Sequence, residues 1–346
     1  MMTPISIAIA TYNRADDLAR TLGGIEALEF DDLDDVEILV IDNNSSDATR
    51  DVSELFERRF QGHFRYVLES RQGLSQARNR AVAEARFGVI AFLDDDVDLD
   101  PGWLRNLASA YESGDYAAVG GRAYLSYPRS RPHWLGERDE GYLTKIELGP
   151  DRLHANPDEL FGVNLSLRKE WIERVGGFRV DLGRIGSCLI GSEETDLLER
   201  IARAGGDLLY EPSAVVAHRV PQNRLRRRWF WSRSYWGHRG EARRSPSREV
   251  SLYEMARKSW HVTLAAWGLT RTLVRRSPWG EEVFHEIVVL SARIGTWVGL
   301  VMRLMSRRDQ TRIILDDEAE DDSSADAGQV PCCVECSGSQ RSICKG

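Results

Sequence analysis

The sequence has few cysteines, and most of them lie outside the segment that we expect to fold. Of the five cysteines in 346 residues, Cys332, Cys333, Cys336 and Cys344 stand in the last fifteen positions, and only Cys188 lies earlier. Disulfide bonds are therefore not expected to hold the fold together. The cysteine-rich tail contains no histidine and fits no common zinc site. Its role stays open between an extension without fixed structure, a modified peptide unit and an added segment.

The sequence also lacks a leader peptide and a long uninterrupted apolar run. The apolar run 5–10 leads straight into polar residues, without the basic start and cleavage site of a secretory signal. Charged residues interrupt the stretch 259–305 before it reaches the roughly 20 apolar residues of a spanning helix. We expect a cytoplasmic protein without a membrane-spanning helix, which contacts the inner face of the membrane peripherally.

Charge is unevenly distributed along the chain. The formal net charge is −8, but the segment 219–276 carries many arginines and only three acidic residues, Glu241, Glu249 and Glu254. This asymmetry predicts a local anionic partner.

Short apolar runs alternate with helical patterns in the first hundred residues. The runs stand at 5–10, 37–41, 64–68 and 89–93, and the helical patterns at 15–28, 48–60 and 74–87. Strand–helix–strand repeats predict an α/β fold with a mainly parallel sheet flanked by helices. Further strands are predicted at 117–127, 160–167 and 208–218, and further helices at 101–107, 169–175 and 192–204.

The alternation stops near residue 223, where we expect a domain boundary. A catalytic domain would then cover 1–222 and a basic, aromatic, helical extension 223–310, with helices at 249–275 and 280–307. The acidic, cysteine-containing tail 311–346 is expected to stay disordered. The polar segment 129–157 is expected to form an irregular, mobile lid.

An acidic run follows the fourth apolar run. Asp94, Asp95, Asp96 and Asp98 stand where a parallel strand would end, and open parallel sheets bind ligands at such ends. Adjacent carboxylates repel each other and raise one another's pKa unless a cation lies between them. A Mg²⁺ or Mn²⁺ ion would relieve that repulsion and take further oxygens from a diphosphate. The alternative is a solvated acidic turn.

Two other polar segments stand at corresponding points of the pattern. The segment 42–47, Asp-Asn-Asn-Ser-Ser-Asp, offers a carboxylate to a base or ribose, but it also suits a turn and a helix cap. The segment 71–79 places Gly73 at a helix start and Arg78 one turn inside, where a phosphate or ribose could be held. A surface salt bridge is the alternative for Arg78.

Taken together, these segments resemble family 2 glycosyltransferases in order and spacing. The matching blocks are 9–14 (Ile-Ala-Thr-Tyr-Asn-Arg), 40–47, Gly73 with 77–79 (Ala-Arg-Asn), and 92–96 (Phe-Leu-Asp-Asp-Asp), within residues 3–220. The resemblance implies a GT-A fold with a mixed sheet, a nucleotide diphosphate sugar as donor, for which we expect a UDP-sugar, a Mn or Mg ion, and inversion at the anomeric carbon.

The resemblance also implies roles for individual residues. The residues that it implies contact the donor are Thr11, Tyr12, Asn13, Arg14, Asp42, Asn44, Gly73, Arg78, Asp94 and Asp95. The metal falls on Asp96 and Asp94, with His218 as a further ligand. A purely structural role is the alternative for the histidine.

The catalytic base falls on Glu194, in the segment 191–197 ahead of a predicted helix. A carboxylate suits this role because the incoming hydroxyl loses its proton as the new bond forms. Glu193 and Asp196 are rivals, since this chain has Glu where the family commonly has Asp. Acidic residues also favour helix N-termini on electrostatic grounds alone.

The acceptor is expected to contact Asn164, in a segment that resembles the stretch beside the family's acceptor pocket, or Trp229 and Trp231. The tryptophans stand among arginines, a mixture that suits a pyrophosphate, a glycan face or an anionic membrane surface. We expect a carbohydrate, lipid-linked or other hydroxyl acceptor. We expect no nucleic acid, because no nucleic-acid-binding module accompanies the segment.

The predicted activity is an inverting transfer of a sugar in polysaccharide, glycolipid or other glycoconjugate synthesis. A nucleotidyltransferase is one alternative, but it would be expected to carry a glycine-rich phosphate loop, which 11–14 lacks. A non-catalytic protein that binds glycans or membranes is the other.

Overall fold

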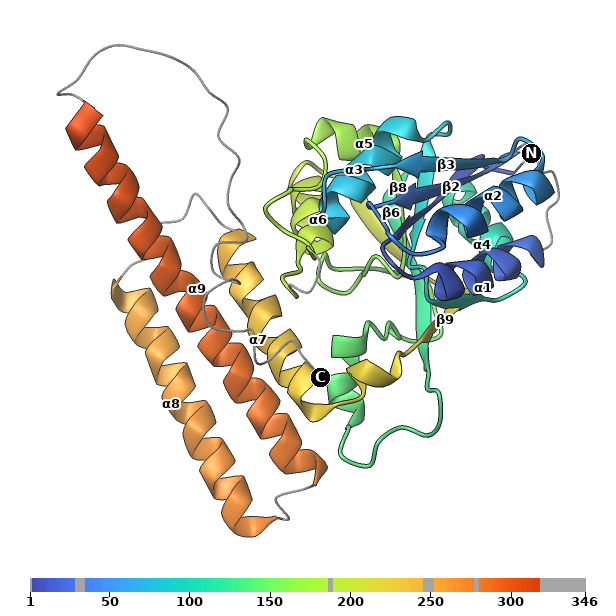
Figure 1. The fold of residues 1–346 in the computed structure, drawn as a ribbon. Coiled ribbons are helices and arrows are strands. Elements are labelled where there is room, and N and C mark those ends of the chain that lie inside the picture. Colours follow the sequence, from blue (N-terminus) through green and yellow to red (C-terminus); the bar gives the residue numbers. More distant parts are fainter. Residues whose placement is uncertain (1, 29–34, 186–188, 245–251, 277–279, 318–346) are drawn as a thin grey trace.

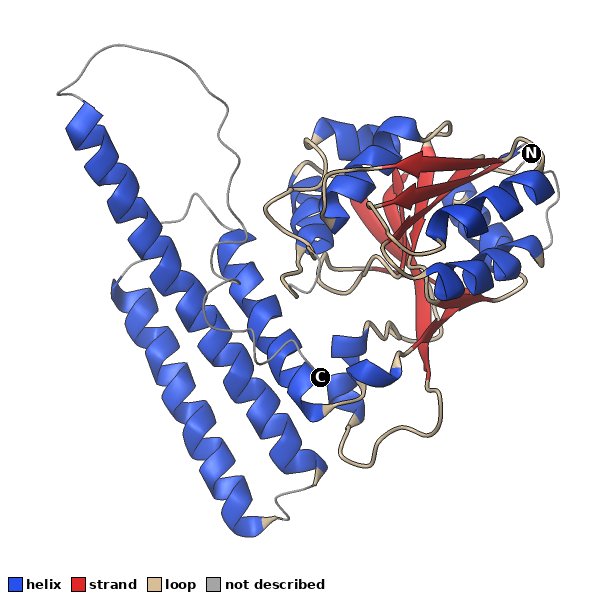
Figure 2. Cartoon of the chain, viewed as in Figure 1, coloured by secondary structure: helices blue, strands red, loops and turns tan. Residues whose placement is uncertain are grey.

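The computed structural model describes residues 2–28, 35–185, 189–244, 252–276 and 280–317. Within them a nine-stranded sheet is packed between two layers of helices, and a separate group of three helices follows (Figures 1 and 2). The predictions for Cys188 and for the four cysteines of the tail fall outside the described residues.

The sheet begins with four parallel strands in the predicted places. They are β1 (Ile5–Thr11), β2 (Val36–Asp42), β3 (Phe64–Leu68) and β4 (Val89–Leu93). Their order in the sheet is β3-β2-β1-β4, and all three pairings are parallel. The carboxyl ends of β1, β2 and β4 are therefore adjacent, with Thr11 opposite Asp42 and Ile9 opposite Leu93.

The other strands make the sheet mixed, as a GT-A fold requires. They are β5 (Val97–Leu99), β6 (Tyr116–Ser126), β7 (Leu153–His154), β8 (Asn164–Arg168) and β9 (Asp207–Arg219). β8 lies between β4 and β6 and is antiparallel to both, whereas β6 and β9 are parallel. β5 and β7 were not predicted, because two or three residues carry no periodic signal.

Helices cover both faces of the sheet. One face carries α1 (Ala15–Glu26), α2 (Thr49–Phe60) and α4 (Trp103–Glu112), whose apolar side chains share a core with β1 and β2. The other carries α3 (Leu74–Glu84), α5 (Lys169–Arg174) and α6 (Glu193–Arg203). Successive side chains of a strand point to opposite faces, so the buried strands feed both cores.

The segment predicted as an irregular lid contains ordered structure. It forms the 3-10 helix η2 (Glu137–Leu143) and the short strand β7, and Trp134, Leu135 and Leu143 are buried. A second 3-10 helix, η3 (Gln222–Arg224), leads out of β9.

The C-terminal extension is a layer of three helices, α7 (Arg227–Arg244), α8 (Leu252–Arg275) and α9 (Glu281–Asp317). α9 packs between α7 and α8, and α8 lies farthest from the sheet (Figure 1). α7 was not predicted as a helix because its arginines and aromatic residues obscure the helical period. α9 continues beyond residue 311, where the disordered tail was predicted to begin.

The expectation that charged residues exclude a spanning helix is wrong for α9. Its segment Glu281–Met305 is long and apolar enough to cross a membrane by length and composition, and 28% of its most apolar window is buried in the protein. Only Arg293 is charged between Glu286 and Arg303, and a single charge does not bring the mean hydropathy of this stretch below that of a spanning helix.

Candidate active site

Polar side chains converge at the ends of β1, β2 and β4, and two of the donor-binding predictions are anchored there by the protein itself. Asp42 accepts hydrogen bonds from the Tyr66 hydroxyl at 2.7 Å and from the Ser45 amide at 2.8 Å. Asn13, in the left-handed region at φ 52°, accepts a hydrogen bond from the Ser46 amide at 2.7 Å. The bond between Asn13 and Ser46 joins the loops after β1 and β2. Tyr12 and Asn44 are exposed on the same loops.

Asn43, which we had not singled out, organises the loop that precedes α3. Its side-chain amide donates to the carbonyls of Glu69 and Arg71, at 3.2 and 2.7 Å, and its side-chain oxygen accepts from the Gly73 amide at 2.8 Å. Gly73 has φ +139°, a conformation that favours glycine. The asparagine thus fixes the backbone at the start of the helix that carries Arg78.

Asp95 points away from the cavity described below and into a cluster with Thr11 and Arg14. Its carboxylate accepts a hydrogen bond from the Thr11 hydroxyl at 2.7 Å and lies 2.9 Å from Arg14 Nη1. Burial raises the pKa of Asp95 above its ordinary value, although the charge of Arg14 opposes this. Arg14 and Thr11, both predicted as donor contacts, therefore already have protein partners.

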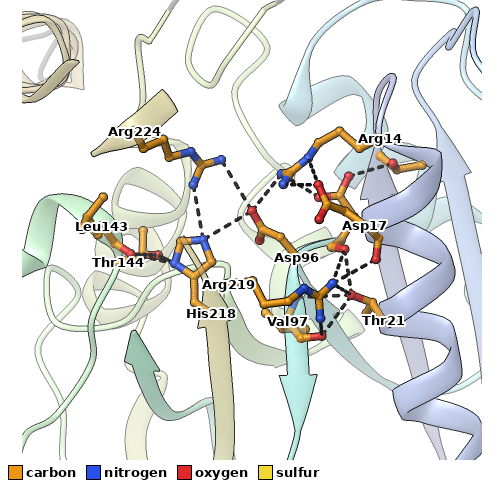
Figure 3. Close-up of polar contacts among 12 residues, drawn as sticks. Arg14, Asp17, Thr21, Asp96, Val97, Leu143, Thr144, His218, Arg219 and Arg224 are labelled. Carbon is orange, nitrogen blue, oxygen red and sulfur yellow. Dashed lines mark hydrogen bonds and ion pairs between the residues drawn. The ribbon is translucent and has the colours of Figure 1, made fainter. Parts of the chain in front are cut away.

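Asp96 occupies the centre of the same cluster (Figure 3). One carboxylate oxygen lies 2.8 Å from Arg14, 3.4 Å from His218 Nε2 and 3.6 Å from Arg224. Burial alone would raise the pKa of Asp96, but the hydrogen bond to His218 and the nearby cations outweigh it and hold that pKa far below its ordinary value. We had expected a metal to relieve the repulsion between the aspartates, yet Arg14 and Arg224 already supply positive charge.

His218 is brought to Asp96 by the short strand β5, in which Val97 is opposite His218 of β9. The imidazole is fully buried, and its Nδ1 lies 2.8 Å from the Leu143 carbonyl. A carbonyl only accepts, so Nδ1 carries the hydrogen, and Nε2 faces Asp96 and Arg224. Because the Asp96 carboxylate also only accepts, Nε2 donates to it, and a cation would have to take the place of that hydrogen to bind at Nε2.

Arg219, which sequence reasoning missed, holds the turn that presents the aspartates. Its guanidinium donates to the carbonyls of Asp95 and Val97 and to the Asp98 carboxylate, and it also reaches the Thr21 hydroxyl (Figure 3). The side chain is buried, so these contacts replace water for a cation inside the protein.

The residues of this cluster fit a metal site that a substrate completes. The second oxygen of Asp96 is buried and has no hydrogen-bond partner, and His218 Nε2 is adjacent. In the described part of the chain, no group of three or more His, Cys, Asp or Glu side chains could hold a metal by itself. Mg²⁺ and Mn²⁺ are commonly bound by one or two protein ligands together with phosphate oxygens, which matches this set.

Beside the cluster lies a cavity of about 510 Å³, lined by acidic and basic side chains from the sheet domain and from α7. Asp94, Glu193 and Glu194 all line it, together with Arg78. Asp94 is thus the aspartate of the triplet that shares a cavity with Glu194, because Asp95 and Asp96 are turned into the arginine cluster. Thr144 connects the two regions, since it lines the cavity and lies 3.2 Å from His218 Nδ1.

Arg78 is buried and bridges the two glutamates, with Nη1 at 2.9 Å from both Glu193 and Glu194. Burial would raise the pKa of Glu194, but the charge of Arg78 prevails and lowers it, so this carboxyl is ionised at neutral pH. Burial and the charge of Glu194 raise the pKa of Glu193. The Glu194 side chain is 16% exposed and that of Glu193 3% exposed, so Glu194 is the more accessible carboxylate.

Asp196, the other rival, does not line the cavity. Its carboxylate lies 3.3 Å from Arg179 and 2.8 Å from Arg200. Arg200 also donates to the Gly177 carbonyl at 2.7 Å, so Asp196 ties α6 to the turn after α5. This is a structural position.

Arg184 and Arg233 line the cavity, and Arg224 lies beside it, next to Asp96. Burial and the nearby Arg184 guanidinium lower the pKa of Arg233 to about 10, and the same two causes lower that of Arg224 to about 10. Arg233 comes from α7, whose predicted role was acceptor or membrane contact, and its Nη1 donates to the Leu189 carbonyl at 3.0 Å. An anionic ligand here would relieve the repulsion among these guanidinium groups.

The three predicted acceptor residues do not line the cavity. The Asn164 carboxamide is fully used: it accepts from Trp103 Nε1 at 2.9 Å and donates to the carbonyls of Arg122 and Ala214. Trp229 and Trp231 pack against the apolar cluster around Phe230. We therefore do not assign these residues to the acceptor.

The comparisons with known proteins bear on this geometry. Residues 6–176 match the family model described as Glycosyl transferase family 2. The chain carries a glycosyl transferase family 2 domain. The protein is thus an enzyme of the glycosyltransferase class, and the nucleotidyltransferase and non-catalytic alternatives are set aside.

Curated relatives of this glycosyltransferase cover most of its length. It is 27% identical over 263 residues to the succinoglycan biosynthesis protein ExoM of Rhizobium meliloti. The matched region covers 75% of this chain and 80% of the relative. It is 24% identical over 236 residues to the glucosyl-dolichyl phosphate glucuronosyltransferase of Haloferax volcanii, which covers 67% of this chain and 74% of the relative.

Solved structures show the same fold. The mannosyltransferase PcManGT of Pyrobaculum calidifontis, in complex with GDP-Man and Mn²⁺, superposes with a TM-score of 0.52 at 17% identity, over 92% of this chain and 80% of that one. GalNAc-T7 with UDP, GalNAc and Mn²⁺ has a TM-score of 0.52 at 16% identity, over 72% of this chain and 52% of that one. The GT-A fold is therefore confirmed.

Proposed function

We propose that this protein transfers a sugar from a nucleoside diphosphate sugar to an acceptor hydroxyl with inversion at the anomeric carbon. The observation that carries the proposal is the pair Glu194 and Asp94 in one cavity, in which Glu194 is ionised and partly exposed. A carboxylate in that state can take a proton from a hydroxyl as it attacks.

The reaction is a single displacement. The acceptor oxygen forms a bond to the anomeric carbon while its proton passes to Glu194, and the bond between that carbon and the phosphate oxygen breaks. The nucleoside diphosphate leaves with the electron pair of that bond. Arg78 holds Glu194 in place, and Arg184, Arg224 and Arg233 stabilise the negative charge of the leaving group.

A divalent cation fits this reaction as a cofactor. Asp96 and His218 would hold it, with Asp94 toward the cavity, and the cation would neutralise charge on the departing diphosphate. Two solved neighbours contain Mn²⁺, one with GDP-Man and the other with UDP, which supports a divalent cation as the cofactor here. Both guanosine and uridine nucleotides are therefore to be tested as donors. UDP-sugars remain our first expectation.

The biological role that we propose is polysaccharide or glycolipid synthesis. The relatives that support it are a succinoglycan biosynthesis protein and an enzyme named for a dolichyl phosphate glycolipid. The acceptor is then a carbohydrate, lipid-linked or other hydroxyl compound.

Two glutamate variants of the full chain test the proposed base. Nucleotide release and sugar transfer are measured with a panel of UDP- and GDP-sugars, with Mn²⁺ and with Mg²⁺. Glu194→Gln should bind nucleotide normally and lose transfer by at least about 100-fold, the usual size of a general-base contribution. Glu193→Gln is the matched control on the same arginine and should keep most of the activity. The reverse pattern would move the base to Glu193, and turnover of no sugar nucleotide by the wild type would refute the activity.

A further inference from the structure

The outer surface of α8 presents an apolar face that no described part of the protein covers. Large apolar side chains recur every seven residues along it and are mostly exposed: Tyr253 at 77%, Trp260 at 59%, Trp267 at 61% and Val274 at 82%. Leu264, four residues after Trp260, is 45% exposed. Seven residues are close to two helical turns, so these side chains form one stripe along the helix.

Basic residues stand within this stripe and beside it. Arg257 and Arg271 follow Tyr253 and Trp267 by four residues, on the same face, and both are exposed. The Arg271 guanidinium lies 5.3 Å from the centre of the Trp267 ring. Arg275 and Arg276 add positive charge at the end of the helix, and Glu254 is the only acidic residue of α8.

The exposed aromatic and basic side chains of the stripe favour one kind of partner over the others that could cover it. A second copy of α8 in either direction would bring arginines against arginines, because the stripe itself contains no acidic residue. Tryptophan and tyrosine favour the interface between membrane and water, and arginine pairs with anionic headgroups. The whole chain has a net charge of −8, so an anionic bilayer would attract this surface and repel much of the rest.

We propose that the outer face of α8, formed by Tyr253, Arg257, Trp260, Leu264, Trp267, Arg271 and Val274, docks the enzyme on the surface of an anionic lipid bilayer. The stripe runs over 22 residues from Tyr253 to Val274, and the 21 steps between these two correspond to about 31 Å of helix lying along the membrane plane. This assigns the membrane contact to α8 rather than to the tryptophans of α7.

The neighbouring helix explains how the docked surface is coupled to the active site. α9 packs against α8 on one side and against α7 on the other, and Trp297 Nε1 donates to Ser259 Oγ at 3.0 Å. α7 in turn contributes Arg233, Gly237, His238 and Glu241 to the cavity. α9 has protein on two sides, and we therefore expect it to support α8 at the surface rather than cross the bilayer.

Vesicle binding by the full chain tests the proposal. Flotation with phosphatidylcholine vesicles is compared with flotation with vesicles that also contain phosphatidylglycerol. The wild type should partition at least about tenfold more strongly onto the anionic vesicles, and added salt should weaken this preference because it screens charge. Tryptophan emission should shift to shorter wavelength on binding.

Two double variants test the apolar and the basic side chains of the stripe separately. Trp260→Ser with Trp267→Ser should lower partitioning by about tenfold or more, and Arg257→Gln with Arg271→Gln should abolish the preference for anionic vesicles. Val180→Ser, which changes a side chain that is 50% exposed on the sheet domain, is the matched control. All variants should unfold at the wild-type temperature and turn over a water-soluble acceptor normally, so a failure here is separate from a failure of the proposed transferase activity.

Three results would overturn the proposal. The first is vesicle binding by the double tryptophan variant equal to that of the wild type. The second is self-association of the wild type, measured by light scattering, that the tryptophan variant loses, since this would assign the stripe to a second copy. The third is wild-type protein that stays in the membrane after an alkaline carbonate wash, since this would mean that α9 spans the bilayer.

Discussion

Gly162 lies directly against the Arg78 guanidinium, and a methyl group added to this glycine would collide with Arg78 Nη2 and lie 2.7 Å from Glu194 Oε1. Gly162 also lines the cavity. The closest neighbours of this glycine are the proposed base and the arginine that positions it.

We therefore predict that Gly162→Ala reduces sugar transfer by about 100-fold, since displacing a catalytic group by about 1 Å costs that much. The variant should retain its thermal stability within a few degrees. Gly141→Ala is the control, because Gly141 lines the same cavity and an added methyl group meets nothing within 4 Å. Equal activity in the two variants would contradict the arrangement. The measurement is steady-state kinetics at saturating donor.

The raised pKa of Glu193 predicts a pH-dependent effect on stability. The folded protein holds a proton on this carboxyl that the unfolded chain releases earlier, so stability is lost as the pH rises between the two pKa values. Glu193→Gln removes that loss. Its free energy of unfolding relative to wild type should increase from about pH 5 to about pH 8, measured by urea denaturation. Glu57→Gln, an exposed change on α2, gives the baseline, and a decrease over the same range would refute the prediction.

The unpaired oxygen of Asp96 predicts a metal-dependent defect. Asp96→Asn should weaken Mn²⁺-dependent binding of a nucleoside diphosphate by at least about tenfold, because it removes a proposed ligand. Calorimetric titration with Mn²⁺ and with EDTA measures this effect, and Asp16→Asn on the exposed side of α1 is the control. If the variant keeps the wild-type dependence on Mn²⁺, Asp96 is not a ligand of the cation. If the wild type itself shows no dependence on Mn²⁺, the arginines alone bind the diphosphate.

Asn164 is predicted to act on stability and not on the acceptor. Asn164→Leu leaves Trp103 Nε1 without its partner inside the protein, which should lower the free energy of unfolding by about 1–3 kcal/mol. The Michaelis constant for the acceptor should stay unchanged in the protein that remains folded. Asn156→Leu on the surface is the control. An increased Michaelis constant with unchanged stability would restore the acceptor role.

The bounds of some strands could be predicted from the sequence alone. β4 has the predicted bounds, because its five consecutive apolar residues form a strand that is buried throughout. β3 also has the predicted bounds, although Arg65 interrupts its apolar residues and the strand is only partly buried. The family resemblance then placed Asp94 and Glu194, and the structure puts both in one cavity. Those assignments needed only the order of motifs along the chain.

The partners of the site residues could not be predicted in the same way. Arg14 and Arg224 neutralise Asp96 from distant parts of the sequence, and Arg219 reaches the same turn only because β9 pairs with β5. The spacing of motifs along the sequence does not reveal such contacts. We therefore expected a metal ion alone to balance the charge of the aspartates, whereas arginines also balance it. The partners of Asn164 could not be predicted for the same reason, since they come from three other elements.

An excursion of the chain joins β6 to β8 and adds the short strand β7 to the sheet on the way. This excursion supplies to the cavity wall Arg138, Gly141, Tyr142, Thr144, Asp158, Phe161, Gly162 and Val163. β8 re-enters between β4 and β6 through its own backbone pairing, whatever the excursion contains. An insertion or exchange in this part of the chain can therefore reshape the pocket for a new acceptor while the carboxyl ends of β1, β2 and β4 stay in place. One sheet can in this way host a range of sugar-accepting specificities.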